Sequence, residues 1–189
     1  LIRKENAEEL NNRINKELVD LEMKNAKINV KVEYKMDEFF EDGKDQVGIF
    51  IKTNVGENES ELTKIASGGE MSRIMLAIKK VLAEVDNMPV MIFDEIDTGI
   101  SGKAAKSVAN KMRSISQNHQ VLCISHLAPI AAMADYNYFI SKKVENDRTC
   151  TNVRLLNEQE VLCEIARISS GEINDVTLQY ANELRNKIA

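Results

Sequence analysis

Residues 90–99 read Val-Met-Ile-Phe-Asp-Glu-Ile-Asp-Thr-Gly, four apolar residues followed at once by a turn rich in carboxylates. A short continuous apolar run that ends in polar residues is typical of a buried strand in a parallel sheet. Residues 121–124, Val-Leu-Cys-Ile, repeat the pattern. Apolar residues recur at three- and four-residue steps over 70–85 and 102–116, which predicts amphipathic helices before and after the first strand. This alternation predicts an α/β layer fold with a parallel core.

The segments flanking this core are predicted from their own periodicity. Residues 1–27 predict a helix with a narrow apolar stripe, typical of a coiled coil, although an ordinary amphipathic surface helix has the same pattern. The stripe consists of Ala7, Leu10, Ile14, Leu18 and Leu21, and in a dissected arm we expect it to be exposed or packed against another copy. Alternating residues predict an antiparallel pair of strands over 28–34 and 47–51. A short helix over 129–134, strands near 138–144 and 149–156, and helices near 158–168 and 173–188 are expected beyond the core.

Composition excludes several classes of protein. The 189 residues carry 25 basic and 30 acidic side chains, so the net charge of −5 does not favour a polyanion and nucleic-acid contact needs a local patch. No apolar run approaches the roughly 18 residues of a membrane helix, and no secretory leader is present. Three widely spaced cysteines fit neither a disulfide framework nor a metal site, which indicates the cytoplasm. The chain begins at Leu1, which indicates a piece of a longer protein.

Ser67-Gly68-Gly69-Glu70 directly precedes the helix expected over 70–85. Two glycines let backbone N–H groups approach a ligand, and the positive end of a helix dipole favours an anion. The same four residues also form an S-x-x-E capping box, and by themselves they are better explained by it. The motif is therefore either an anion site or a plain helix start.

Asp94 and Glu95 follow the first apolar strand, and His126 follows the second. Because parallel strands end at the same edge of a sheet, we expect these side chains at one cleft. Adjacent side chains point in different directions at a strand end, so the two carboxylates can have different roles. Asp94 can bind a hydrated Mg²⁺, and Glu95 can orient a water for nucleotide hydrolysis. His126 could hydrogen-bond a phosphate oxygen. The alternatives are a solvated strand end for the carboxylates and a structural role for the histidine.

A complete phosphate loop is missing. Gly99-Ile-Ser-Gly102-Lys103-Ala104 has only two residues between its glycines, whereas G-x-x-x-x-G-K-[ST] needs four, and Ala104 replaces the hydroxyl that binds Mg²⁺. The sequence therefore contains no Walker A motif.

The order and spacing of these clusters resemble the C-terminal half of an ABC-type ATPase head. Residues 64–77, Lys-Ile-Ala-Ser-Gly-Gly-Glu-Met-Ser-Arg-Ile-Met-Leu-Ala, and residues 92–102, Ile-Phe-Asp-Glu-Ile-Asp-Thr-Gly-Ile-Ser-Gly, look like those of the RecN family, SMC-like ATPases of bacterial DNA repair and recombination. Residues 124–129 continue the resemblance, which covers nearly the whole chain. Ala66 and Glu70 stand where transporters usually have Leu and Gln, which argues against a transporter subunit.

The resemblance implies a role for each cluster. Residues 67–70 would be the signature motif and bind ATP together with Asp97 of the D-loop. Residues 90–94 would be Walker B, with Asp94 as the Mg²⁺ ligand. Glu95 would be the catalytic glutamate and His126 the switch histidine.

The resemblance also implies an organisation and partners. Residues 1–27 would be the base of a coiled-coil arm, and 28–189 the C-terminal half of the head. The N-terminal half of the same protein would supply Walker A, a second identical head would complete each ATP site, and DNA would be the substrate, in the cytoplasm at the nucleoid. The 189 residues alone are expected not to hydrolyse ATP. Another SMC or Rad50-like head and a non-catalytic dimerising module of the same fold remain alternatives.

Overall fold

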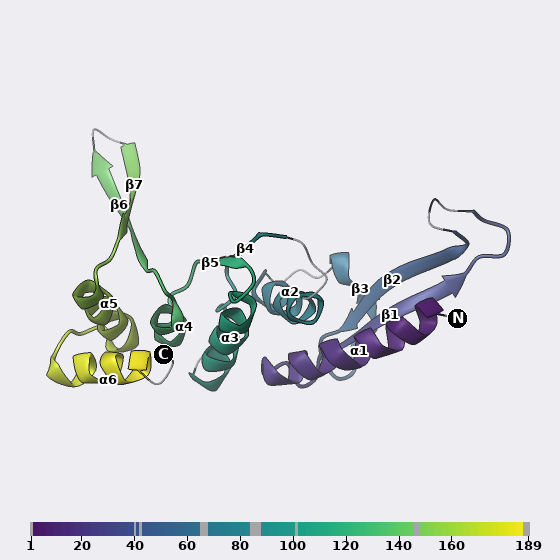
Figure 1. Cartoon of the computed structure of the whole chain (residues 1–189), viewed down its shortest axis with the longest axis horizontal. Helices are drawn as coiled ribbons and strands as arrows, with labels where there is room; N and C mark the ends of the chain where they lie inside the picture. Colours follow the sequence, from purple (N-terminus) through teal and green to yellow (C-terminus); the bar gives the residue numbers. More distant parts are fainter. Residues whose placement is uncertain are drawn as a thin grey trace. The chain divides into compact units, whose positions relative to one another are not determined.

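The computed structural model describes residues 2–39, 41, 43–64, 68–83, 88–100, 102–145 and 148–186. The chain divides into two compact units, residues 1–99 with 114–124, and residues 100–113 with 125–189 (Figure 1). The elements are, in order, α1 (Ile2–Asp20), β1 (Lys27–Tyr34), β2 (Asp45–Lys52), β3 (Ser60–Glu61), a 3₁₀ turn (Leu62–Lys64), α2 (Gly68–Leu82), β4 (Val90–Phe93), α3 (Gly102–Ile115), β5 (Gln120–Cys123), α4 (Ala128–Met133), β6 (Tyr138–Glu145), β7 (Arg148–Leu155), α5 (Glu158–Ser170) and α6 (Asp175–Asn186). The mixed α/β class predicted from the sequence is confirmed. Within the described residues, no helix is both long and apolar enough to cross a bilayer.

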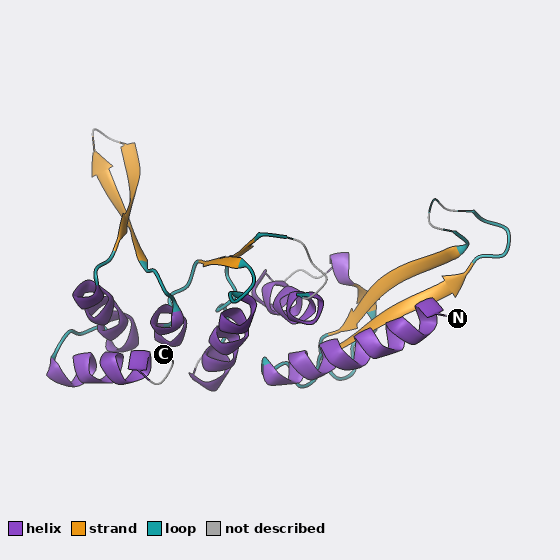
Figure 2. Cartoon of the chain, viewed as in Figure 1, coloured by secondary structure: helices purple, strands orange, loops and turns teal. Residues whose placement is uncertain are grey.

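Helix α1 packs along the β1–β2 hairpin of the first unit (Figures 1 and 2). The strands pair antiparallel from Lys27↔Lys52 to Tyr34↔Asp45, as predicted. The helix stops at Asp20, seven residues before the expected end, because the chain turns there and Glu22 adopts a left-handed conformation. The expectation of an exposed apolar stripe is wrong for this chain: Ile14, Leu18 and Leu21 are at most 1% exposed. The stripe is part of the unit's own core.

Two asparagines of α1 close part of the free edge of β1. Asn15 Oδ1 accepts from Ile28 N at 2.7 Å, and its Nδ2 donates to Ile28 O at 3.0 Å. One helical turn earlier, Asn11 accepts from Val30 N at 2.7 Å and donates to Val30 O at 3.5 Å. Residues four apart on a helix face the same way, so the two amides meet alternate residues of the strand. Side chains thus replace a neighbouring strand and fix α1 against the sheet.

Strands β4 and β5 pair parallel, which confirms the predicted parallel core. Full burial of both strands, which the continuous apolar runs predicted, is wrong. Met91 and Phe93 are buried, whereas Val90 and Ile92 are exposed, and so are Leu122 of β5 and Ile124 just after it. Because side chains alternate along a strand, the sheet has one covered and one open apolar face.

The second unit has its own core where α4, α5 and α6 meet. Its buried residues are Ala128, Ala132, Val161, Ile165, Ala166 and Ala181. Helix α5 begins with a capping box between Asn157 and Glu160 and is capped at its other end by Gly171, whose φ of 80° is in the left-handed region that favours glycine. The antiparallel β6–β7 hairpin extends from this core, and every residue of β7 is exposed.

Candidate functional site

The start of α2 lies directly against the turn that follows β4. A Cβ on Gly69 would lie 2.8 Å from Thr98 Cβ and 2.9 Å from Thr98 O, so only glycine allows this approach. Gly68 is equally close to Glu95, because a Cβ there would collide with a carboxylate oxygen. Ser72 Oγ, one turn further along α2, donates to Asp94 O at 2.8 Å. The structure therefore brings two of the predicted clusters together, 68–70 and 94–97.

The turn itself has an unusual backbone. Glu95 has a φ of 55°, which is uncommon for a residue with a side chain, and its carbonyl accepts from Thr98 N at 3.1 Å. Asp94 Oδ1 accepts from Glu95 N at 2.9 Å, which fixes the orientation of the Asp94 carboxylate. Both carboxylates are exposed. Exposed carboxylates on a tight turn can reach a ligand in solvent.

Glu95 points toward the positive end of α2. Its carboxylate contacts Gly68, in the first turn of the helix, where the helix dipole stabilises negative charge. In this conformation Glu95 interacts with its own chain.

Arg73 is a site residue that sequence reasoning missed. It is 7% exposed, and its Nη1 donates to Thr98 O at 2.8 Å, which ties α2 to the turn. Burial lowers the pKa of its guanidinium, and the Glu70 carboxylate opposes that shift. Its position in the sequence could have indicated this role, because Arg73 is four residues after Gly69 and therefore on the same, buried face of α2.

Asp97 is buried, whereas Asp94 and Glu95 in the same turn are exposed. Its residue is 3% exposed, next to the fully buried Ile96. Burial, then the charges of Asp97 and Asp94, raise the pKa of the Cys123 thiol to about 12. The carboxyl end of β5 is thus close to the turn after β4, as the parallel pairing requires. Cys123 itself is only partly buried, although the apolar run 121–124 predicted a buried strand.

The structure does not place two of the predicted residues relative to this cluster. Ser67 lies outside the described residues. His126 is exposed and belongs to the second unit, two residues along the chain from Ile124, whose N–H donates to Phe93 O at 3.0 Å. Their roles stay predictions.

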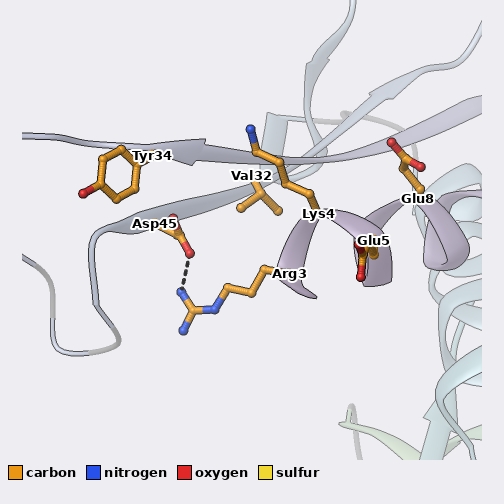
Figure 3. A pocket seen from close by; sticks show the side chains of 7 residues that line it. All are labelled: Arg3, Lys4, Glu5, Glu8, Val32, Tyr34 and Asp45. Carbon is orange, nitrogen blue, oxygen red and sulfur yellow. Dashed lines mark ion pairs between the residues drawn. The ribbon is translucent and has the colours of Figure 1, made fainter. Parts of the chain in front are cut away.

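A hollow of about 330 Å³ lies elsewhere in the first unit, at the start of α1 (Figure 3). Arg3 and Asp45 form an ion pair of 3.5 Å at its rim, and Val32 and Tyr34 line it from β1. None of the predicted site residues lines it. Its charges are mixed in sign, so it does not select one kind of ligand.

The sequence has close counterparts among known proteins. The DNA repair protein RecN of Halalkalibacterium halodurans is 44% identical over 187 residues, which is 97% of this chain and 33% of that protein. RecN of Bacillus subtilis is 46% identical over 145 residues, which is 76% of the chain and 25% of that protein. The chain belongs to the RecN family. It spans about a third or less of the length of these RecN proteins, and no family model matches it.

Solved structures agree with the RecN assignment at the level of the fold. The SMC head domain of Pyrococcus yayanosii, solved with a coiled coil and joint, has a TM-score of 0.61 at 19% identity and covers 89% of this chain and 30% of its own. A protein from work on ATP-driven dimerization of SMC ATPases has a TM-score of 0.53 at 17% identity, over 91% of this chain and 98% of its own. This RecN segment therefore has the fold of part of an SMC ATPase head.

Proposed function

We propose that this chain is the C-terminal half of the ATPase head of a RecN-type protein, and that the complete protein hydrolyses ATP in the repair of DNA double-strand breaks by recombination. The observation that carries the proposal is the contact between the start of α2 and the turn after β4, where Gly68 and Gly69 meet Glu95 and Thr98. The two exposed carboxylates on this turn are suited to Mg²⁺ in their own head, and the glycine-containing helix N-terminus is suited to a phosphate of the ATP held by a second head.

Each carboxylate has a different task in this proposal. Mg²⁺ would neutralise the phosphate charge of ATP, and it usually binds one or two carboxylates together with water and phosphate oxygens. Asp94 fits that pattern, since its carboxylate is exposed and fixed by the Glu95 N–H. Glu95 would leave Gly68, accept a proton from the attacking water and orient it in line with the γ-phosphate. His126 would donate a hydrogen bond to that phosphate, and Asp97, as the D-loop aspartate, would contribute to ATP binding.

The N-terminal half of the same protein would complete the head. Val90, Ile92, Leu122 and Ile124 form an exposed apolar face on a sheet that has only two described strands. Parallel sheets are normally covered on both faces, so this face requires further chain. The missing half would also bring the phosphate loop that this sequence lacks. In a bacterial cell we expect the protein in the cytoplasm, at the nucleoid.

ATP turnover tests the proposal most directly. The 189-residue chain alone should show none, whereas a protein of full RecN length that contains it should hydrolyse ATP. In that protein Glu95→Gln should lower turnover by roughly 10²–10⁴-fold and leave ATP binding intact, because the amide keeps the shape but cannot accept the proton. Glu9→Gln, a change of the same kind on an exposed position of α1, is the matched control. Near-normal turnover of Glu95→Gln would contradict the assignment, and His126 would then be the next candidate.

A second head would use the signature residues of the first. Ser67→Arg in the full-length protein should abolish ATP-driven dimerisation and leave ATP binding to each head largely unchanged, as sedimentation and nucleotide titration would show. Loss of binding to the monomer would assign residues 67–70 to their own head. Dimerisation without any turnover would favour the non-catalytic alternative.

A further inference from the structure

We propose that the outer face of α3 binds the phosphate backbone of DNA. The inference rests on the proposed role in DNA repair, but it concerns residues that the ATPase assignment leaves without a function. The outer face is the row of exposed residues Lys103, Lys106, Asn110 and Arg113, spaced three or four apart along the helix.

Charge is distributed unevenly between the two units. The first unit contains 21 acidic and 14 basic residues, whereas the second contains 9 acidic and 11 basic. The net charge is thus −7 for the first unit and +2 for the second, so the charge of the second unit is the more favourable for a polyanion. Within the second unit, α3 carries Lys103, Lys106, Lys111 and Arg113 and no acidic residue.

The helix dipole favours a basic residue at only one end of this row. Lys103 is in the first turn, where the helix dipole disfavours a cation by about 0.3–1 kcal/mol. Arg113 is in the last turn, where the dipole favours it, and it pairs with Asp135 at 2.6 Å. The opposite face of α3 is apolar and buried through Ala105, Val108 and Met112. The outer face is thus the side of α3 that a binding partner can contact.

The dimensions of the row fit a nucleic-acid strand. Ten residues separate Lys103 from Arg113, which is about 15 Å along an α-helix. Phosphates of one DNA strand advance about 3.4 Å along the axis per nucleotide, so the row spans about four of them. Lysines and asparagine amides donate hydrogen bonds to phosphate oxygens without reading bases. The face therefore fits DNA independently of sequence.

Salt-dependent DNA binding tests the inference. The full-length protein would be titrated into a fluorescein-labelled duplex of random sequence, and anisotropy measured at several salt concentrations. Lys103→Gln/Lys106→Gln should lower the slope of log K against log salt by about 1.8 and weaken binding about 10- to 100-fold near 0.1 M salt, because two phosphate contacts are lost. Lys142→Gln/Lys143→Gln, which removes the same charge from exposed positions of the same unit, should leave both unchanged.

ATP turnover of the double variant separates this inference from the proposed function. Turnover without DNA should equal that of the wild type, which also shows that the variant folds. A slope unchanged from the wild type, an equal loss in the control variant, or no DNA binding by the wild type at low salt would each overturn the inference. DNA binding that depends on α3 in a protein without ATPase activity would support the α3 surface and refute only the catalytic proposal.

Discussion

The amide of Asn15 should contribute measurably to the stability of the first unit. Asn15→Ala removes the acceptor of Ile28 N–H at 2.7 Å and the donor to Ile28 O at 3.0 Å. Ile28 is 1% exposed, so water reaches its backbone poorly after the change. A buried polar group without a partner costs about 1–3 kcal/mol. We therefore expect the free energy of unfolding to fall by about 1–3 kcal/mol relative to a matched control.

Asn12→Ala is that control. Asn12 is exposed on the same helix, so both variants gain the same helix propensity, at most about 0.7 kcal/mol, and only one loses the bonds to β1. The free energy of unfolding of Asn11→Ala should lie between those of the other two variants, because one of the two contacts of Asn11 with Val30 is long, at 3.5 Å. Urea denaturation gives the three free energies.

Hydrogen exchange makes the test local. The Ile28 amide should exchange faster in Asn15→Ala and be unchanged in Asn12→Ala, because opening of that edge no longer breaks a bond. Equal stability of the two variants within 0.5 kcal/mol, together with a slowly exchanging Ile28 amide, would refute the reasoning. The edge of β1 would then be stabilised by the packing of α1 and not by its asparagines.

Three further changes follow from packing and burial. Leu18→Ala should lower the free energy of unfolding by about 2–5 kcal/mol, measured in urea, because Leu18 is fully buried; a loss under 1 kcal/mol would indicate that α1 is detached in solution. Gly69→Ala should destabilise by about 1–3 kcal/mol and open the contact with Thr98, since backbone must move; an unchanged melting temperature would contradict the close approach. Cys123, with a thiol pKa of about 12, should be alkylated far more slowly at pH 8 than the exposed Cys150, and mass spectrometry after short iodoacetamide treatment should find Cys150 modified first.

The sequence by itself determined the class of fold, the order of its elements and the family. These features could be predicted because the apolar residues repeat with clear periods along the chain. Period-two and period-3.6 patterns depend only on which residues alternate, so the β1–β2 pair, α2 and the parallel β4–β5 pair were all predicted. The sequence also singled out residues 68–70 and 94–97 by their order and spacing, and the structure brings the two segments together, whereas their roles at an ATP site stay predictions.

Tertiary structure alone decided where the apolar stripes are buried. The stripe of α1 has the spacing of a coiled-coil seam, but it packs on its own hairpin, since a pattern specifies a face and not the surface that covers it. The apolar runs of β4 and β5 predicted two covered faces, but one face is exposed in the described part of this chain, because an apolar run does not specify which segments pack on it.

Hydrogen bonds between segments that are distant in the sequence could not be predicted from the sequence either. Asn11 and Asn15 read as ordinary polar residues of a helix, and only the fold shows that their amides replace a strand. Arg73 likewise becomes a site residue only because α2 lies against the turn after β4, where Thr98 O needs a donor. Periodicity identifies the side of an element that is buried, whereas pairing of individual polar groups depends on the approach of two backbones, which the fold alone sets.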